Sequence, residues 1–155
     1  MIVVKRSARA ILLDGSELIL MKRTKPGQTP YWVTVGGGIE ADDPSIEDAL
    51  HREVFEELGA TLTRAELAHL ISTPVEGGIA VQHIFAAQLG HMDITVRTGE
   101  EFARTDRGMY EVVRIPFTAA AIRGVAVMPT ELGDFMAANI DAITALLGTK
   151  VRRTR

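Results

Sequence analysis

A β-rich segment of this chain, residues 31–35, runs directly into three consecutive glycines, and a helix-like segment follows after a short acidic stretch. In that segment aliphatic side chains recur at every fourth position, at Ile46, Leu50, Val54 and Leu58. This spacing predicts an amphipathic helix with one buried stripe. A strand, a glycine-rich loop and a helix in this order predict a domain in which strands and helices pack in layers.

Both ends of the predicted helix carry sequence signals. In one alternative Asp43 is the N-cap and Pro44 occupies the first helical position. In the other, Ser45 is the N-cap and Asp48 completes a capping box three residues later. Gly59 is expected just after the last turn, because glycine adopts the left-handed conformation there at little cost.

Three glutamates of this helix, Glu53, Glu56 and Glu57, are spaced at i, i+3 and i+4 and therefore share one face. Like charges at such spacings destabilise a helix by about 0.2–0.5 kcal/mol per pair. A chain that keeps this cluster beside a glycine-rich loop is expected to neutralise it with a cation. Oxygen-only ligands favour a hard divalent ion such as Mg²⁺ or Mn²⁺.

The rest of the chain is predicted to contain several strands and one further long helix. Five segments are expected to be strands, at residues 2–13, 18–21, 62–75, 79–89 and 109–116. The polar residues 97–107 are expected to form a loop. A short helix is predicted over 117–123, and a long one over 130–147, where apolar residues follow a helical period. This pattern predicts a layered α/β or α+β domain.

Length and composition narrow the class of protein. The 155 residues predict one domain, over residues 1–150, followed by a basic tail at 151–155. A net charge of −3 provides no basic surface for a nucleic-acid polymer, and the lack of cysteine excludes disulfides and thiolate nucleophiles. The chain shows no signal peptide and no apolar run near the roughly 20 residues that span a bilayer, so we expect a cytoplasmic protein without a membrane partner.

The glycine run and the acidic helix together resemble the box of the Nudix hydrolases. That box is a glycine, five residues, a glutamate, seven residues, and then Arg-Glu-aliphatic-x-Glu-Glu-x-Gly-aliphatic. Here it covers residues 37–60, and the matching positions are Gly37, Arg52, Glu53, Val54, Glu56, Glu57 and Gly59. The chain departs from the pattern in three ways. Asp43 replaces the first glutamate, eight residues rather than seven separate it from Arg52, and Ala60 replaces a larger aliphatic residue.

The resemblance implies an α+β domain of the Nudix type, an α/β/α sandwich with a mixed β-sheet between helices. It also implies metal-dependent hydrolysis, with Mg²⁺ or Mn²⁺ held by Glu53, Glu56, Glu57 and the carbonyl of Gly36. Divalent ions neutralise phosphate oxygens and lower the pKa of bound water. Arg52 is expected to orient the carboxylates of the box.

Candidate residues also lie outside the box. The resemblance implies a general base that is either a box glutamate or a later loop glutamate, for which Glu100 and Glu101 are the candidates. Arg23, at the end of a predicted strand, is a candidate phosphate contact. Tyr31 and Trp32 are candidates for stacking on a nucleobase, although strand residues at these positions would equally fill the core.

Two functions are compatible with these residues. The first is a Nudix pyrophosphohydrolase that cleaves a nucleoside diphosphate linked to another moiety, a small-molecule substrate. The alternative is a catalytically weak Nudix-fold module that senses a ligand or binds a protein. Such modules usually lose box glutamates, and this chain retains all three. A homodimer is an expectation from the family alone, and the sequence leaves the exact substrate and the role of Asp43 open.

Overall fold

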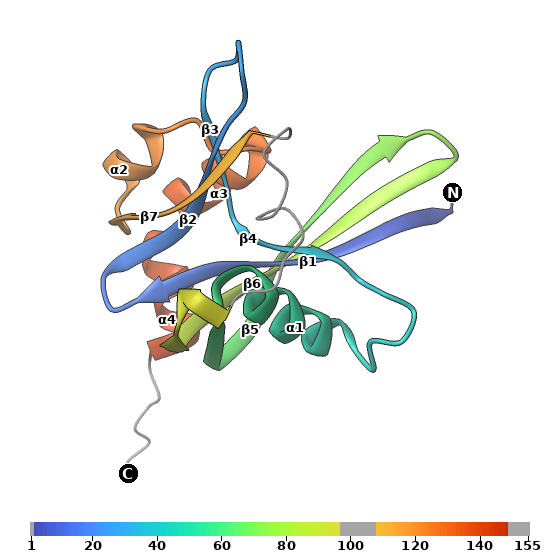
Figure 1. The fold of residues 1–155 in the computed structure, drawn as a ribbon, viewed down its shortest axis with the longest axis horizontal. Coiled ribbons are helices and arrows are strands. Elements are labelled where there is room, and N and C mark those ends of the chain that lie inside the picture. The colour runs from blue at the N-terminus through green and yellow to red at the C-terminus, as the bar shows by residue number, and fades with distance from the viewer. Residues whose placement is uncertain (1, 97–107, 149–155) are drawn as a thin grey trace.

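The computed structural model describes residues 2–96 and 108–148. Within these residues seven strands form one sheet: β1 (Val3–Asp14), β2 (Glu17–Thr24), β3 (Tyr31–Val33), β4 (Val35–Gly38), β5 (Ala60–Val75), β6 (Gly78–Met92) and β7 (Met109–Pro116). The helices are α1 (Ile46–Leu58), α2 (Ala119–Arg123), α3 (Thr130–Ala138) and α4 (Ile140–Gly148), with a short 3₁₀ helix, η1 (Ile94–Val96), after β6. Figure 1 shows how they are arranged.

The sheet is mixed, and β1 is its central strand. Its main strand order is β3-β2-β1-β6-β5, while β4 pairs with β1 and β7 pairs with β2. β1 runs parallel to β6, and the other pairs are antiparallel. One edge of β1 pairs with β6. The opposite edge is divided between two strands, because Ser7–Ala10 pair with β4 whereas Leu12–Asp14 pair with β2. β4 and β2 therefore occupy successive segments of the same edge of β1.

Helices cover both faces of this sheet. Alternate residues of β1 belong to two different apolar clusters, as expected for side chains that point to opposite faces. One cluster holds α1 through Ala49, Leu50, Val54 and Leu58. The other holds α2, α3 and α4 through Ile122, Leu132, Met136, Ile143 and Leu147. Burying each of the larger side chains, from Val to Met, contributes about 1.5–3 kcal/mol. The predicted α+β fold with a mixed sheet between helices is confirmed.

The ends of α1 follow the sequence signals. Ser45 is the N-cap, and its Oγ accepts a hydrogen bond of 3.0 Å from the Asp48 N–H. Of the two predicted starts, the N-cap at Ser45 is therefore the one that forms, and the Ser45 hydroxyl in turn donates to Asp48 Oδ2 at 2.9 Å. Gly59 ends the helix in the left-handed conformation, with φ of 63°. A Cβ there would lie 1.9 Å from the Asp93 carbonyl oxygen, so glycine also allows η1 to pack on this end of α1.

The prediction of one long helix over residues 130–147 is wrong in one respect, because the segment forms two helices that meet at Asn139. Asn139 has φ of −131° and ψ of 33°, outside the helical region. Its side-chain amide donates to the Phe135 carbonyl at 2.8 Å, and its backbone N–H donates to Met136. Asparagine competes in this way with the helical hydrogen bonds, which explains the break.

Some sequence predictions lie outside the described residues. These are the loop over 97–107, which contains Glu100 and Glu101, and the basic tail at 151–155. Among the helices that the structure does describe, none is both long enough and apolar enough to cross a membrane.

Candidate active site

The first glycine of the run, Gly36, lies directly against β1. It pairs with Arg9 across the two strands and has φ of 147°. A Cβ at this position would lie 2.2 Å from the Ala8 carbonyl oxygen and 2.6 Å from the Arg9 Cα. Glycine permits this approach because it has no side chain and adopts positive φ without strain. The close contact places the Gly36 peptide at the wall of a cavity.

The second glycine makes room for an acidic side chain of α1. A Cβ on Gly37 would lie 2.5 Å from Glu53 Oε1, so the Glu53 carboxylate rests against the backbone of β4. One turn later on α1, the buried Glu57 accepts a hydrogen bond of 3.0 Å from the Gly36 N–H. Two of the three clustered glutamates therefore pack directly on the glycine strand.

Arg52 connects the start of α1 with these glutamates. Its Nε and Nη2 each donate to one carboxylate oxygen of Asp43 at 2.9 Å. Its Nη1 lies 3.1 Å from Glu53 Oε2 and 3.2 Å from Glu56 Oε2. Nη2 also donates to the Gly38 carbonyl at 3.0 Å. Because the two-pronged pair with Asp43 orients the guanidinium, Arg52 is held where it neutralises two clustered carboxylates.

This pairing gives the stability of the protein a pH dependence. The hydrogen bond from Arg52, and then that from the Glu40 backbone, lower the pKa of Asp43 from 3.8 to about 2. The ionised carboxylate is thus favoured in the folded state. Its contribution to stability is complete above the unfolded pKa of 3.8 and is lost as the pH falls toward 2.

We therefore expect the free energy of unfolding of Asp43→Asn to change less than that of the wild type between pH 4 and 2, the range that spans the two pKa values. Urea titrations followed by circular dichroism at several pH values would measure the difference. Asp42→Asn, at the exposed neighbouring position, is the matched control and should follow the wild type. Parallel pH profiles for Asp43→Asn and the wild type would contradict this assignment.

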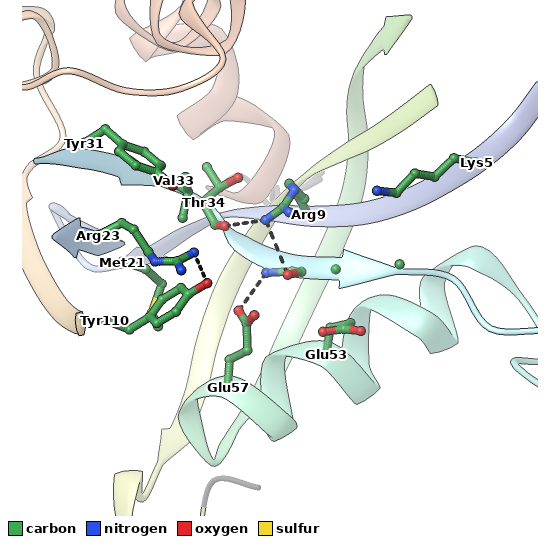
Figure 2. Close-up of a pocket in the computed structure, with 13 residues that line it drawn as sticks. Lys5, Arg9, Met21, Arg23, Tyr31, Val33, Thr34, Glu53, Glu57 and Tyr110 are labelled. Atoms are coloured by element: carbon green, nitrogen blue, oxygen red, sulfur yellow. Dashed lines mark hydrogen bonds between the residues drawn. The ribbon is translucent and has the colours of Figure 1, made fainter. Parts of the chain in front are cut away.

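A cavity of about 630 Å³ opens beside the glycine strand. Glu53 and Glu57 of α1 line one side, and Lys5, Arg9 and Arg23 lie across from them (Figure 2). The remaining lining residues are Met21, Tyr31, Val33, Thr34, Gly36, Gly37, Gly38 and Tyr110. Carboxylates opposite basic side chains suit a ligand that carries phosphate groups together with a metal ion. The carboxylates can bind the metal ion, and the basic side chains can bind the phosphates.

Three neighbouring strands place Tyr31, Arg23 and Tyr110 in one row. Arg23 on β2 pairs with Tyr31 on β3 and with Tyr110 on β7. The Arg23 guanidinium lies 3.9 Å from the centre of the Tyr110 ring, and Nη1 donates to the Tyr110 hydroxyl. The predicted candidates Arg23 and Tyr31 therefore lie in the cavity. Tyr110 and Lys5 were not predicted, because only the pairing of strands distant in sequence brings them there.

Within the described ranges, three predicted site residues do not line this cavity: Trp32, Arg52 and Glu56. Trp32 belongs to the opposite face from Tyr31 and packs against the cluster that holds α3. Its backbone N–H donates to the Ala126 carbonyl at 2.9 Å and its carbonyl accepts from the Met128 N–H at 2.8 Å, which connects β3 to the segment before α3. The Glu56 side chain is 36% exposed, compared with 13% for Glu53.

The oxygen donors around Gly36 fit a divalent cation in kind. The Glu53 and Glu57 carboxylates and the Gly36 peptide meet at one cavity, and such hard donors suit Mg²⁺ or Mn²⁺. Within residues 2–96 and 108–148, however, no three His, Cys, Asp or Glu side chains are grouped as they would be around an ion. The Arg52 guanidinium lies between Glu53 and Glu56, so their convergence requires Arg52 to yield at least one of them.

A second cavity, of about 440 Å³, adjoins the first. Both are lined by Lys5, Arg9, Val33 and Gly38, so these residues form the boundary between them. The rest of the second cavity is mainly apolar, with Ser7 and Gln82 as polar groups among Ala80, Val81, Met128 and Pro129. Apolar walls with a few polar groups are typical of sites for the organic part of a small molecule.

Comparison with known proteins identifies related sequences and folds. The model of the NUDIX domain family matches residues 4–121 of the chain. A comparison with curated protein sequences gives no significant match.

Among solved structures, the ORF135 protein of E. coli has a TM-score of 0.62 at 21% identity, over 96% of this chain and 94% of that one. A MutT NUDIX hydrolase from Burkholderia pseudomallei has a TM-score of 0.60 at 20% identity, over 83% and 94% of the two chains. A NUDIX hydrolase from Nitrosomonas europaea has a TM-score of 0.65 at 16% identity, over 86% and 88%. At these identities the likeness shows a shared fold.

Proposed function

This chain belongs to the NUDIX domain family, whose model matches most of its length, and we propose that it hydrolyses the pyrophosphate linkage of a nucleoside diphosphate joined to another moiety. One observation carries the proposal. Glu53 and Glu57 face Lys5, Arg9 and Arg23 across a single cavity (Figure 2). The carboxylates suit the metal, and the basic side chains suit phosphate oxygens that the metal leaves uncovered.

The proposed cofactor is Mg²⁺ or Mn²⁺, held by Glu53, Glu56, Glu57 and the Gly36 carbonyl. Such an ion supplies positive charge to the phosphate oxygens and promotes ionisation of an attacking water. The protein holds the donors in place. The Gly36 N–H positions Glu57 through the 3.0 Å hydrogen bond. Arg52, which contacts both Glu53 and Glu56, would keep one of them in place while the other turns to the ion.

The proposed general base is one of the glutamates. Glu53 and Glu57 line the cavity, which supports a base within the box. The predicted alternatives, Glu100 and Glu101, lie outside the described residues. A carboxylate in this role accepts the proton of the attacking water, a contribution of about 10²–10⁴-fold to the rate.

The cavity walls support a substrate with a group on each side of the diphosphate. On one side, Arg23 would contact a phosphate while Tyr31 and Tyr110 provide aromatic surfaces for a planar group such as a nucleobase. On the other side, the second cavity gives an organic group apolar walls beyond Lys5 and Arg9. Two recognition regions that flank the acidic groups suit a diphosphate that joins two moieties.

The test is hydrolysis of a panel of nucleoside diphosphate derivatives, each with Mg²⁺, with Mn²⁺ and with a chelator. We expect turnover of one substrate class in the presence of either metal and complete loss with the chelator, because the phosphate charge is then uncompensated. Release of nucleoside monophosphate, quantified by chromatography, is the measurement. Turnover that persists in chelator would contradict the proposed cofactor.

The same panel distinguishes the alternative function. A folded protein that binds nucleotide derivatives tightly but hydrolyses none of them, with either metal, would be a ligand-sensing module of the Nudix fold. Calorimetric titration with the panel compounds would measure this binding directly. The retention of Glu53, Glu56 and Glu57 is the reason that hydrolysis is the leading proposal.

A further inference from the structure

Arg9 occupies an unusual place at the boundary of the two cavities. Its Nη1 donates to the Thr34 carbonyl at 2.9 Å and to the Gly36 carbonyl at 3.3 Å (Figure 2). The stem of Arg9 crosses β4 where Gly36 has no side chain, since a Cβ there would lie 2.9 Å from the Arg9 Cγ. One cationic group is therefore held on two backbone oxygens of the site.

Gly36 connects this cation to the acidic face of α1 through its two backbone polar groups. Its carbonyl accepts from Arg9, and the N–H of the same residue donates to Glu57 at 3.0 Å. Arg9 and Glu57 thus hold one glycine from opposite sides, a basic group on its oxygen and an acidic group on its nitrogen. The carbonyl that Arg9 contacts is also the oxygen assigned above as a metal ligand.

A guanidinium and a divalent ion on the same carbonyl oxygen repel each other, because both are positive and the distance between them would be only a few ångströms. Arg9 has a favourable alternative position. It lines both cavities, so its guanidinium is already beside the space assigned to the phosphates. A phosphate oxygen offers it a stronger, charge-assisted hydrogen bond than a carbonyl does.

We propose that Arg9 holds the Gly36 carbonyl while the metal is absent, leaves it when a divalent ion binds, and then contacts the substrate phosphate. This inference rests on the proposed function, because it assumes the metal at Gly36. In the absence of substrate Arg9 opposes metal binding. When metal and substrate are both present, Arg9 favours the complex of the protein with the two. Metal and substrate would therefore bind cooperatively, with Arg9 as the residue that couples them.

The proposal predicts effects of opposite sign for one substitution. In Arg9→Met the competing charge is gone while the apolar stem is kept, so the metal should bind more tightly without substrate, by about three- to tenfold. The same change removes a phosphate contact, so the KM for substrate should rise. If Arg9 only supported the β4 backbone, its replacement would weaken metal binding and substrate binding alike.

Mn²⁺ binding to the substrate-free protein, followed by electron paramagnetic resonance of the unbound ion, tests the first effect without any turnover. Lys5→Met is the matched control. It removes the same charge from the same cavity four residues earlier on β1, while the contacts to Thr34 and Gly36 come from Arg9. Arg9→Lys is a second variant, in which the positive charge remains, so its Mn²⁺ affinity should stay close to that of the wild type.

Tighter Mn²⁺ binding by Arg9→Met than by wild type, Lys5→Met and Arg9→Lys would support the proposal. Equal or weaker binding by Arg9→Met, with thermal unfolding unchanged, would overturn it. If Arg9→Met unfolds, Arg9→Gln, which keeps an amide donor for the two carbonyls, replaces it and should likewise bind Mn²⁺ more tightly. Failure of the proposed function is seen separately, as wild-type protein that binds Mn²⁺ but hydrolyses no substrate in the panel.

Discussion

Glu57→Gln is expected to lower turnover by about 10²–10⁴-fold while the protein stays folded. The substitution removes a negative charge from the wall of the cavity, and with it the proposed metal ligand or base. Shape is preserved, because the glutamine side chain still offers an oxygen to the Gly36 N–H that now donates to Glu57. Steady-state hydrolysis of the preferred substrate, with thermal unfolding measured on the same samples, gives both quantities.

Glu47→Gln is the matched control for that experiment. Glu47 lies in the first turn of α1, its side chain is 54% exposed, and it contacts His51 rather than the cavity. The same loss of charge on the same helix should leave turnover near that of the wild type. A Glu57→Gln enzyme as active as Glu47→Gln would exclude Glu57 from the chemistry.

Gly36→Ala is expected to destabilise the fold more than any other substitution in the glycine run. The new Cβ would lie 2.2 Å from the Ala8 carbonyl oxygen, a backbone atom that cannot rotate away. Non-glycine residues at unfavourable φ cost about 1–3 kcal/mol, and overpacking adds about 1–3 kcal/mol. The expected sum of about 2–6 kcal/mol is comparable to the stability of many domains.

Gly38→Ala provides the comparison within the same strand. A Cβ on Gly38 meets no atom within 4 Å, and its φ is not among the positive values. Urea unfolding of the two variants should therefore show a large fall in midpoint for Gly36→Ala and little change for Gly38→Ala. Similar midpoints would mean that β1 and β4 are further apart than the structure places them.

Much of the acidic wall of the site is predictable from the sequence because its groups are close together in the chain. Glu53 and Glu57 lie one turn apart on one helix, and Gly36 is only 21 residues from Glu57. The end at Gly59 is a local signal that formed as predicted, and Ser45 is one of the two caps that the sequence offered, the other being Asp43. Interactions within a turn or two of helix depend on spacing alone, which the sequence displays directly.

The basic and aromatic wall is less predictable because it depends on strand register. Tyr110 reaches Arg23 across 87 residues of sequence, through the pairing of β2 with β7. Trp32 and Tyr31 are adjacent and chemically alike, yet the strand directs them to opposite faces, and only Tyr31 lines the cavity. A shift of one residue in register would exchange their roles.

The divided edge of β1 also bears on how proteins of this kind can diverge. The segment from β4 to the end of α1, residues 35–58, carries the acidic groups in one continuous stretch that pairs with Ser7–Ala10. Arg23, Tyr31 and Tyr110 come from β2, β3 and β7, and of these only β2 pairs with β1, beyond this stretch at Leu12–Asp14. Mutations in those strands can change which molecule is accepted while the pairing of β4 with β1 is untouched. Substrate preference can therefore drift, in nature or in the laboratory, without rebuilding the segment that we propose carries out hydrolysis.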